Sequence, residues 1–221
     1  LVGSEMCIRD RTSISGYAEL IETGIAKPED TPGFARKIHV EASRMIQLVN
    51  DILQLSHLDN VSETGAAPAM ETVDLLDVAR ECVERQKVNA RHSYISLTYL
   101  GESAPVTGSR VLLDELCQNL CDNAIRYNRP GGKVQIITAC TRDGHCTLTV
   151  KDNGIGIPKD AQSSVFERFY RVDKSRSKAT GGTGLGLAIV KHIARIHNAR
   201  IKLDSVVDEG TTITVIFETA S

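Results

Sequence analysis

A glycine-rich run directly ahead of an apolar helical pattern constrains this chain more than any other feature. The run spans Gly181 to Gly186, and apolar residues at helical spacing continue to His197. Glycines let the backbone approach a ligand closely, and the first turn of a helix has unpaired N–H groups that favour negative charge. The pattern therefore predicts a helix over residues 183–197 whose N-terminus faces an anion.

An asparagine pair upstream adds a second element to such a site. Asn119 and Asn123 are four residues apart in a predicted helix that ends at Tyr127, so their amides lie on one face. An amide oxygen is a hard donor that suits Mg²⁺. Glu115 lies one turn earlier on the same face. Arg126 and Tyr127 extend this surface towards a phosphate and a base or ribose.

A third motif follows a predicted strand. Asp152 comes after the strand 147–151 and is followed by Gly154 and Gly156. A carboxylate there can accept a hydrogen bond from an adenine amino group, while the glycines let the turn close against the base. Singly, these motifs have ordinary explanations, such as a solvated asparagine pair or an Asp-Asn-Gly turn. Together and in this order, they suit the parts of a magnesium nucleotide and predict an ATP site.

The three motifs, with the Phe-Glu-Arg-Phe-Tyr-Arg segment at 166–171, resemble the N, G1, F and G2 boxes of two-component sensor histidine kinases. The resemblance extends from about Thr12 to Thr219 and is greatest to the phosphate-regulon sensor type. It implies the α/β-sandwich ATPase fold that these kinases share with gyrase, the mismatch-repair ATPases and a heat-shock chaperone family. It also implies that residues 153–183 form a mobile lid over ATP.

The resemblance further implies roles for single residues. Asn119 would bind Mg²⁺ and Asn123 the phosphates, with ATP and Mg²⁺ as the cofactors. Arg171 could reach the γ-phosphate from the lid, and with Asn119 and Glu115 it completes the expected catalytic set. The expected nucleotide-binding residues are Asn119, Asn123, Arg126, Tyr127, Asp152, Gly154, Gly156, Gly182, Thr183, Gly184, Leu185, Gly186 and, from the family's last-strand pattern, Thr212.

The N-terminal part predicts a helical hairpin. A helix over 12–27 is followed by a Pro-containing break at 27–32 and a longer helix to about Asp59. Apolar residues of the second helix recur every seven residues and cover a wider arc than one partner helix can bury, which favours a four-helix bundle made by two chains. The alternative is that the hairpin packs onto its own domain. The resemblance implies that residues 12–60 are part of the dimerisation and histidine-phosphotransfer domain.

Residues 61–70 are small and polar and are typical of a linker, and residues 71–221 form the predicted catalytic domain. Asp74 and Ser109 are expected N-caps of two helices. Alternating apolar residues flank Asp143-Gly144 and the turn at Gly210, which predicts two hairpins. Helices grouped between such strands predict an α+β fold, with a mixed, mainly antiparallel sheet covered by helices on one face. Residues 153–183 are expected to be a loop with short helices.

The first eleven residues depart from the family pattern. Its acceptor histidine lies in a Ser-His-Glu-Leu-Lys/Arg-Thr-Pro-Leu motif, and counting back from Thr12 places that histidine at Glu5 and its acidic neighbour at Met6. Residues 1–11 also lack a helical period in phase with the next helix and look like a translated sequencing adapter. The alternative is a genuine divergent N-terminus. We expect the native sequence to begin at about Thr12 and the acceptor to be missing.

Charge and cysteine usage bound the remaining possibilities. The 221 residues carry a net charge of −2 and only 4% aromatic residues, which argues against a nucleic-acid partner. No stretch reaches the roughly 18–20 apolar residues of a membrane-spanning helix. The six cysteines show no paired spacing, so buried, reduced thiols of a cytosolic protein are expected.

We therefore expect a fragment of a sensor histidine kinase. It would dimerise through residues 12–59, transfer the γ-phosphoryl group of ATP to a histidine and pass it to an aspartate of a response-regulator receiver domain. It would be the cytoplasmic part of a membrane-anchored sensor whose membrane segments lie upstream. Two alternatives stay open. The long apolar hairpin argues against a protein-serine kinase of the anti-sigma type, while the missing acceptor favours a non-catalytic ATP-binding interaction module.

Overall fold

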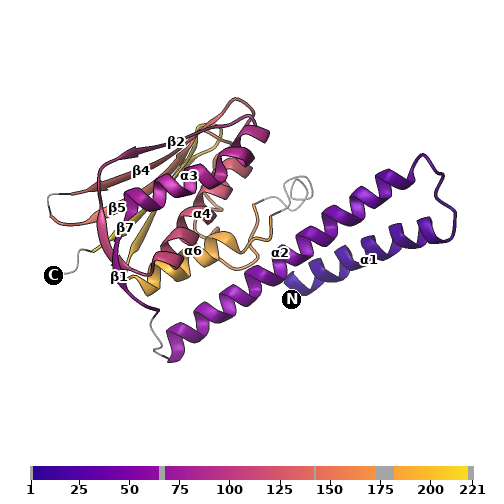
Figure 1. The fold of residues 1–221 in the computed structure, drawn as a ribbon, viewed down its shortest axis with the longest axis horizontal. Coiled ribbons are helices and arrows are strands. Elements are labelled where there is room, and N and C mark those ends of the chain that lie inside the picture. The colour runs from indigo at the N-terminus through magenta and orange to yellow at the C-terminus, as the bar shows by residue number, and fades with distance from the viewer. Residues whose placement is uncertain (1, 65–67, 142, 173–181, 219–221) are drawn as a thin grey trace.

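The chain folds into a long helical hairpin followed by an α/β domain, which confirms the predicted fold class (Figure 1). The computed structural model describes residues 2–64, 68–141, 143–172 and 182–218. Helix α1 (Val2–Glu22) and helix α2 (Thr31–Thr64) run antiparallel, and their connected end projects away from the α/β domain. Near that end, the rings of Tyr17 and Phe34 stack with centroids 5.3 Å apart.

Both hairpin helices extend beyond the segments that their apolar spacing predicts, although α1 ends at Glu22, before the predicted end at residue 27. Helix α1 continues through residues 2–11, and α2 reaches Thr64, inside the segment expected to be a linker. Residues 4–11 and 60–64 contain no proline or glycine. Because adding a residue to an existing helix costs far less than nucleating a new one, both helices extend beyond the segments whose side-chain pattern requires them.

A five-stranded sheet with the order β2-β4-β5-β7-β6 is the frame of the α/β domain. Its strands β2 and β4 are parallel, and all other neighbours are antiparallel, as the mixed sheet predicted from the hairpin turns requires. The strands are β2 (Ser96–Gly101), β4 (Lys133–Cys140), β5 (Cys146–Asp152), β6 (Arg200–Val206) and β7 (Gly210–Phe217).

Three helices cover one face of this sheet and form the core with it (Figure 1). They are α3 (Leu75–His92), α4 (Arg110–Arg126) and α6 (Gly186–Ile196). Apolar residues at helical spacing, such as Leu116, Leu120 and Ile193, are buried against alternating strand residues such as Leu148 and Val215. The helix layer matters for function because α4 and α6 carry two of the predicted motifs.

A small two-stranded sheet, which includes the first strand of the α/β domain, was not predicted. Strands β1 (Glu71–Asp74) and β3 (Pro105–Gly108) pair antiparallel. Each has only four residues, which is too short for an alternating pattern to stand out in a sequence. Asp74 caps α3, as expected: its Oδ1 accepts the amide of Leu76 at 2.9 Å.

Ser109 occupies the N-cap position of α4, as expected, but its side chain makes no capping hydrogen bond; its backbone amide donates to Nε2 of His197 at 3.0 Å. Two other expectations about local structure are wrong. The described part of the expected lid, residues 153–172, consists of turns without a helix, and α6 begins at Gly186 rather than Thr183. Residues 173–181 lie outside the described residues.

The expectation of reduced cysteines is also corrected. Cys140 and Cys146 form a disulfide, while Cys82, Cys117 and Cys121 are buried free thiols. The two bonded residues stand directly opposite each other in the β4–β5 pairing. Spacing along the chain did not indicate this partnership because it arises from the strand register.

Candidate nucleotide-binding site

Helix α4 brings the asparagine pair against the start of α6. A Cβ atom placed on Gly186 would lie 3.0 Å from Oδ1 of Asn119 and 3.5 Å from Nδ2 of Asn123. Asn119 donates from Nδ2 to the backbone oxygen of Glu115 at 3.1 Å, which orients its amide on the helix. A side chain at position 186 would therefore crowd both amides, and glycine leaves them facing an open helix N-terminus.

The last turn of α4 forms another wall of the same site. A Cβ atom on Gly182 would lie 2.9 Å from Nη1 of Arg126 and 3.3 Å from the hydroxyl of Tyr127. Gly184 adopts φ +75°, a left-handed conformation that suits glycine, and its carbonyl accepts the amide of Phe169 at 2.9 Å. The glycine loop is thus held between α4 and the Phe-Glu-Arg-Phe segment.

Two residues of the loop have side chains that contact other parts of the protein. Leu185 is fully buried in the core, so only its backbone can contact a ligand. The hydroxyl of Thr183 donates to Oδ2 of Asp51, on α2, at 2.5 Å. Both were expected among the nucleotide contacts. In the structure the side chain of Leu185 packs in the core, and the side chain of Thr183 is hydrogen-bonded to the hairpin.

Asp152 ends β5 and lies on the helix-covered side of the sheet. Burial raises the pKa of Asp152, and hydrogen bonds to its Oδ1 from the amides of Gly154 (2.8 Å) and Thr211 (3.2 Å) oppose that rise. A Cβ atom on Gly154 would lie 2.4 Å from the backbone oxygen of Tyr127, and Gly156 has φ +68°. The turn therefore needs both glycines, which a simple Asp-Asn-Gly turn does not.

The strand register favours Thr211 over the expected Thr212. Thr212 pairs with Lys151, and its neighbour Ile213 points into the core, so Thr212 faces the opposite side of the sheet from Asp152. Thr211 instead donates to Asp152 and lies 2.9 Å from the hydroxyl of Ser205. Because side chains alternate along a strand, an offset of one residue decides which threonine faces the site.

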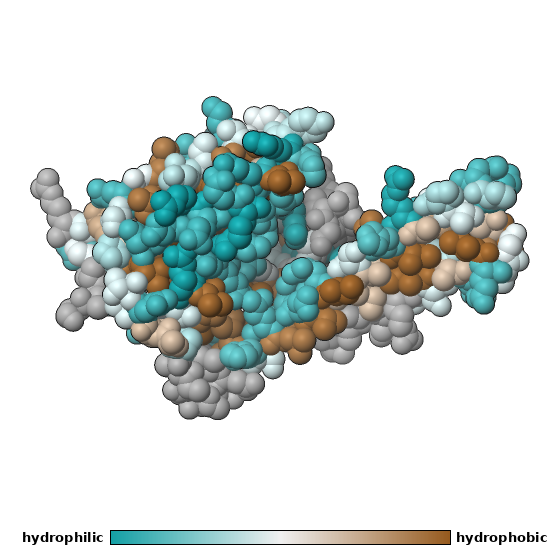
Figure 2. Space-filling model, viewed as in Figure 1, coloured by the Kyte–Doolittle hydropathy of each residue, from teal (hydrophilic) through white to brown (hydrophobic). Residues whose placement is uncertain are grey.

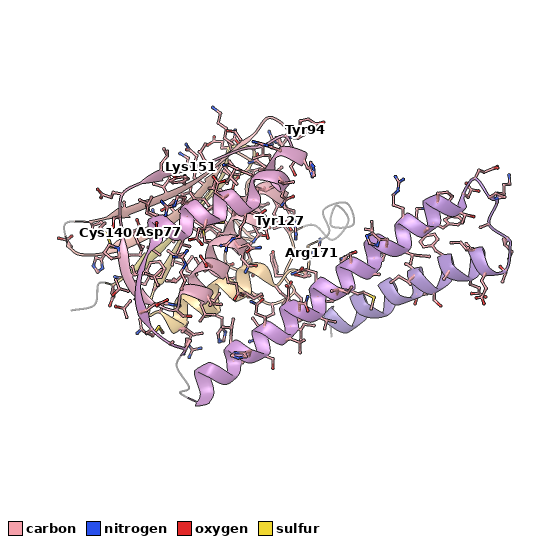
Figure 3. All side chains as sticks on the ribbon, in the orientation of Figure 1. Asp77, Tyr94, Tyr127, Cys140, Lys151 and Arg171 are labelled. Atoms are coloured by element: carbon pink, nitrogen blue, oxygen red, sulfur yellow. A yellow bond between two sulfur atoms is a disulfide. The ribbon has the colours of Figure 1, made fainter. Side chains whose placement is uncertain are left out.

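Glu115 lies where α4 meets α2. Burial raises its pKa to about 7; the charge of Asp51 adds to the rise, and a hydrogen bond with Gln54 opposes it. Arg171 is half-buried just ahead of residues 173–181. Figure 3 shows Tyr127 and Arg171 on the hairpin side of the domain, whereas Cys140 lies at its other end.

The contribution of α2 is what the sequence interpretation missed. Asp51 contacts the glycine loop, and Asp59 accepts two hydrogen bonds from Arg168, at 2.8 and 2.9 Å. In a sequence, acidic residues on an amphipathic helix are indistinguishable from a solvated face. Asp51 lies three residues after Leu48 and four before Leu55, on the same face of the helix, and this spacing is the sequence signal that it could be buried with them.

Comparison with known proteins agrees with this geometry. Residues 108–221 match the family of histidine kinase-, DNA gyrase B- and HSP90-like ATPases, and residues 12–61 match the His Kinase A phospho-acceptor domain. The chain belongs to the two-component sensor histidine kinases, of which it contains the ATP-binding core and the acceptor-type hairpin.

Individual relatives are similar over most of this chain. The sensor-like histidine kinase SenX3 of Mycolicibacterium smegmatis is 42% identical over 92% of it, and the chain spans about half (52%) of that relative's length. A mycobacterial sensor histidine kinase, MprB, has a solved structure with 32% identity and a TM-score of 0.58, covering 67% of this chain and 97% of that one. The histidine kinase ThkA, solved in complex with the response regulator TrrA, shares the fold. It is 20% identical with a TM-score of 0.73, and the match covers 98% of this chain and 60% of that chain. Among the residues that the structure describes, no helix is long and apolar enough to cross a membrane.

Proposed function

We propose that this chain is the kinase core of a sensor histidine kinase that uses MgATP to phosphorylate a histidine, from which an aspartate of a response regulator receives the phosphoryl group. In the first transfer the bond from the γ-phosphorus to the β–γ bridging oxygen breaks, a phosphorus–nitrogen bond forms, and ADP leaves. The observation that carries the proposal is the convergence of Asn119, Asn123 and Gly186 at the start of α6.

The residues present fit a magnesium nucleotide. Asn119 would hold Mg²⁺ through Oδ1, and the N-terminus of α6 would hold phosphate through its free amides. Bound Mg²⁺ would neutralise phosphate charge. Arg126 and Arg171 would supply positive charge to the phosphates, and Asp152 would accept a hydrogen bond from the adenine amino group. Positioning and charge neutralisation are the main tasks of a protein in phosphoryl transfer.

Calorimetry with and without Mg²⁺ tests these roles. Asn119→Ala should weaken binding of ATP mainly in the presence of Mg²⁺, because the metal contact is lost. Asp152→Ala should weaken binding in both conditions, because the adenine contact does not depend on metal. Equal losses for both variants in both conditions would contradict the assignment.

We also propose that the chain binds ATP without phosphorylating itself. A glutamate at position 5 cannot replace a neutral imidazole as acceptor. Replacing residues 1–11 by a helix that ends Ser-His-Glu-Leu-Arg-Thr-Pro-Leu before Thr12 should restore labelling by radioactive ATP, and Asn119→Ala should abolish it again. Equally fast histidine labelling of the unaltered chain would show that another histidine is the acceptor.

A separately purified phosphotransfer domain distinguishes the remaining candidates. An acid-labile phosphohistidine on that domain supports the kinase, and an acid-stable phosphoserine supports the anti-sigma type. Absence of any label supports an ATP-binding interaction module, which the residue at position 5 favours for this chain.

The hairpin supports a second copy of this chain and a receiver domain as partners. Exposed apolar side chains follow one side of α2 (Figure 2): Ile46, Val49, Ile52 and Leu53. A stripe of this kind suits a four-helix bundle formed by two hairpins. The complex of ThkA with TrrA supports a receiver domain as partner by analogy of fold. We place the chain in the cytoplasmic part of its sensor, where ATP is available.

A further inference from the structure

A buried carboxylate of the hairpin contacts the glycine loop. Asp51 and Thr183 are 8% and 7% exposed, and the hydroxyl of Thr183 donates to Oδ2 of Asp51 at 2.5 Å. The other oxygen of Asp51 accepts Nε2 of Gln47 at 2.7 Å. The amide of Leu185, at the start of α6, lies 3.4 Å from the hydroxyl of Thr183. A negative charge is thus held beside the helix N-terminus that the proposed function reserves for phosphate.

A second carboxylate holds the outer edge of the same interface. Asp59 accepts both hydrogen bonds from the guanidinium of Arg168, and its Oδ1 lies 3.6 Å from Nδ1 of His192, on α6. The backbone oxygen of Leu58 lies 3.2 Å from Nε2 of the same histidine. Through Arg168, α2 contacts the described part of the expected lid.

Packing between these two contacts is incomplete. Leu55 and Leu58 are buried, but an open groove of about 350 Å³ lies beside them, lined by Leu53, Gln54, His57, Leu58, Leu112 and Glu115. The groove limits the apolar contact between α2 and the domain to a few residues, among them Leu55 and Leu58, and the polar contacts of Asp51 and Asp59 add to it at both ends. Separation of α2 from the domain would expose little additional apolar surface at the groove.

We infer that Asp51, together with Asp59, forms a latch that joins α2 to the domain and competes with the phosphates of ATP for the glycine loop. This rests on the proposed function, because it takes the glycine loop as the phosphate site. Carboxylate and phosphate repel each other, and their repulsion is strong where water is excluded. Bound nucleotide therefore favours release of α2 from the domain. Conversely, only molecules with the latch open bind nucleotide, so the apparent affinity falls in proportion to the fraction of open molecules.

Titration calorimetry with MgATP on the full chain tests the competition. Asp51→Asn keeps the shape but removes the charge, and Asp51→Ala removes both. Both variants should bind MgATP about tenfold more tightly than the unaltered chain. Asp59→Asn should tighten binding about threefold, because its ion pair is more exposed. The matched control is Asn50→Ala, which truncates an exposed side chain one position away and should leave the affinity unchanged.

Hydrogen exchange without nucleotide tests the contact itself. In the Asp51 variants the amides of residues 183–190 should exchange faster than in the unaltered chain, and in the Asn50 control they should not. Unchanged exchange, or weaker or equal binding of MgATP by the Asp51 variants, would overturn the latch. Failure of every form to bind MgATP would instead refute the proposed function, and the exchange experiment would still decide whether Asp51 holds the loop.

Discussion

At the scale of single residues, Glu115, which lies where α4 meets α2, makes the stability of the folded protein depend on pH. Its pKa is raised to about 7 because burial disfavours the charged carboxylate. The folded state therefore binds more protons than the unfolded state between pH 4.5 and 7, and stability falls as the pH rises through this window. Above pH 7 the penalty is fully present; below pH 4.5 it is absent.

Glu115→Gln should remove most of this pH dependence. Because Glu115 is only partly buried, we expect the variant to gain roughly 1–2 kcal/mol relative to the unaltered chain on going from pH 5 to pH 8. Urea unfolding at both pH values measures the difference. Parallel stability curves for the two proteins would contradict a raised pKa at this position.

A substitution at Gly186 should affect nucleotide binding and folding stability differently. Alanine favours a helix over glycine, so Gly186→Ala should leave the unfolding free energy unchanged or raise it by up to about 1 kcal/mol. Its Cβ atom would crowd the amides of Asn119 and Asn123, so we expect affinity for MgATP to fall about tenfold, equivalent to ~1.4 kcal/mol. Gly33→Ala is the control, since nothing lies within 4 Å of the added atom. Unchanged affinity in Gly186→Ala would argue against a site at the start of α6.

At the scale of elements, Asp74 joins α3 to the small sheet. Its Oδ1 accepts the amides of Leu76 (2.9 Å) and Ala104 (2.8 Å), and its Oδ2 accepts the hydroxyl of Ser103 at 2.6 Å. Burial by itself would raise the pKa of Asp74, but these hydrogen bonds outweigh burial and lower it. The stabilisation is present above the ordinary pKa of an aspartate and is lost as the pH falls through the lowered value.

Asp74→Ala should destabilise the protein by about 1–3 kcal/mol, because a helix cap and the anchor of the β1–β3 connection are lost together. Thermal unfolding at pH 7 measures this, and the loss should shrink towards pH 3 as the carboxylate of the unaltered chain is protonated. Asp77→Ala is the matched control: it removes a partly exposed carboxylate of the same helix turn, which pairs with the exposed Arg80, and it should cost less. A cost for Asp74→Ala that does not change with pH would exclude the charged carboxylate as its cause.

At the scale of the whole molecule, the exposed stripe of α2 predicts the oligomeric state. Val49 is 51% exposed in the single chain, between other exposed apolar residues of the same helix. Val49→Glu would bury an unpaired charge in a dimer seam at a cost of several kcal/mol, and should convert a dimer to a monomer. Sedimentation equilibrium measures this, with Asn50→Ala as a control that should remain dimeric. An unaltered chain that stays monomeric at high concentration would contradict the four-helix bundle.

Local patterns determined much of the architecture and the likeness to the kinase family. Period-seven and period-two spacing predicted the hairpin and the strands of the sheet, and the glycines, Asn119, Asn123 and Asp152 indicated an ATP site. These features depend on residue types a few positions apart, so they can be predicted from the sequence.

Other features depend on how distant segments meet, and only the tertiary structure decided them. The register of β7 against β5 makes Thr211, rather than Thr212, the neighbour of Asp152. The packing of α2 against α6 buries Asp51 beside Thr183. Residues 51 and 183 have no local relation that a pattern could reveal. Their contact follows from the free energy of burying Leu48, Leu55 and Leu58, which is a property of the whole fold.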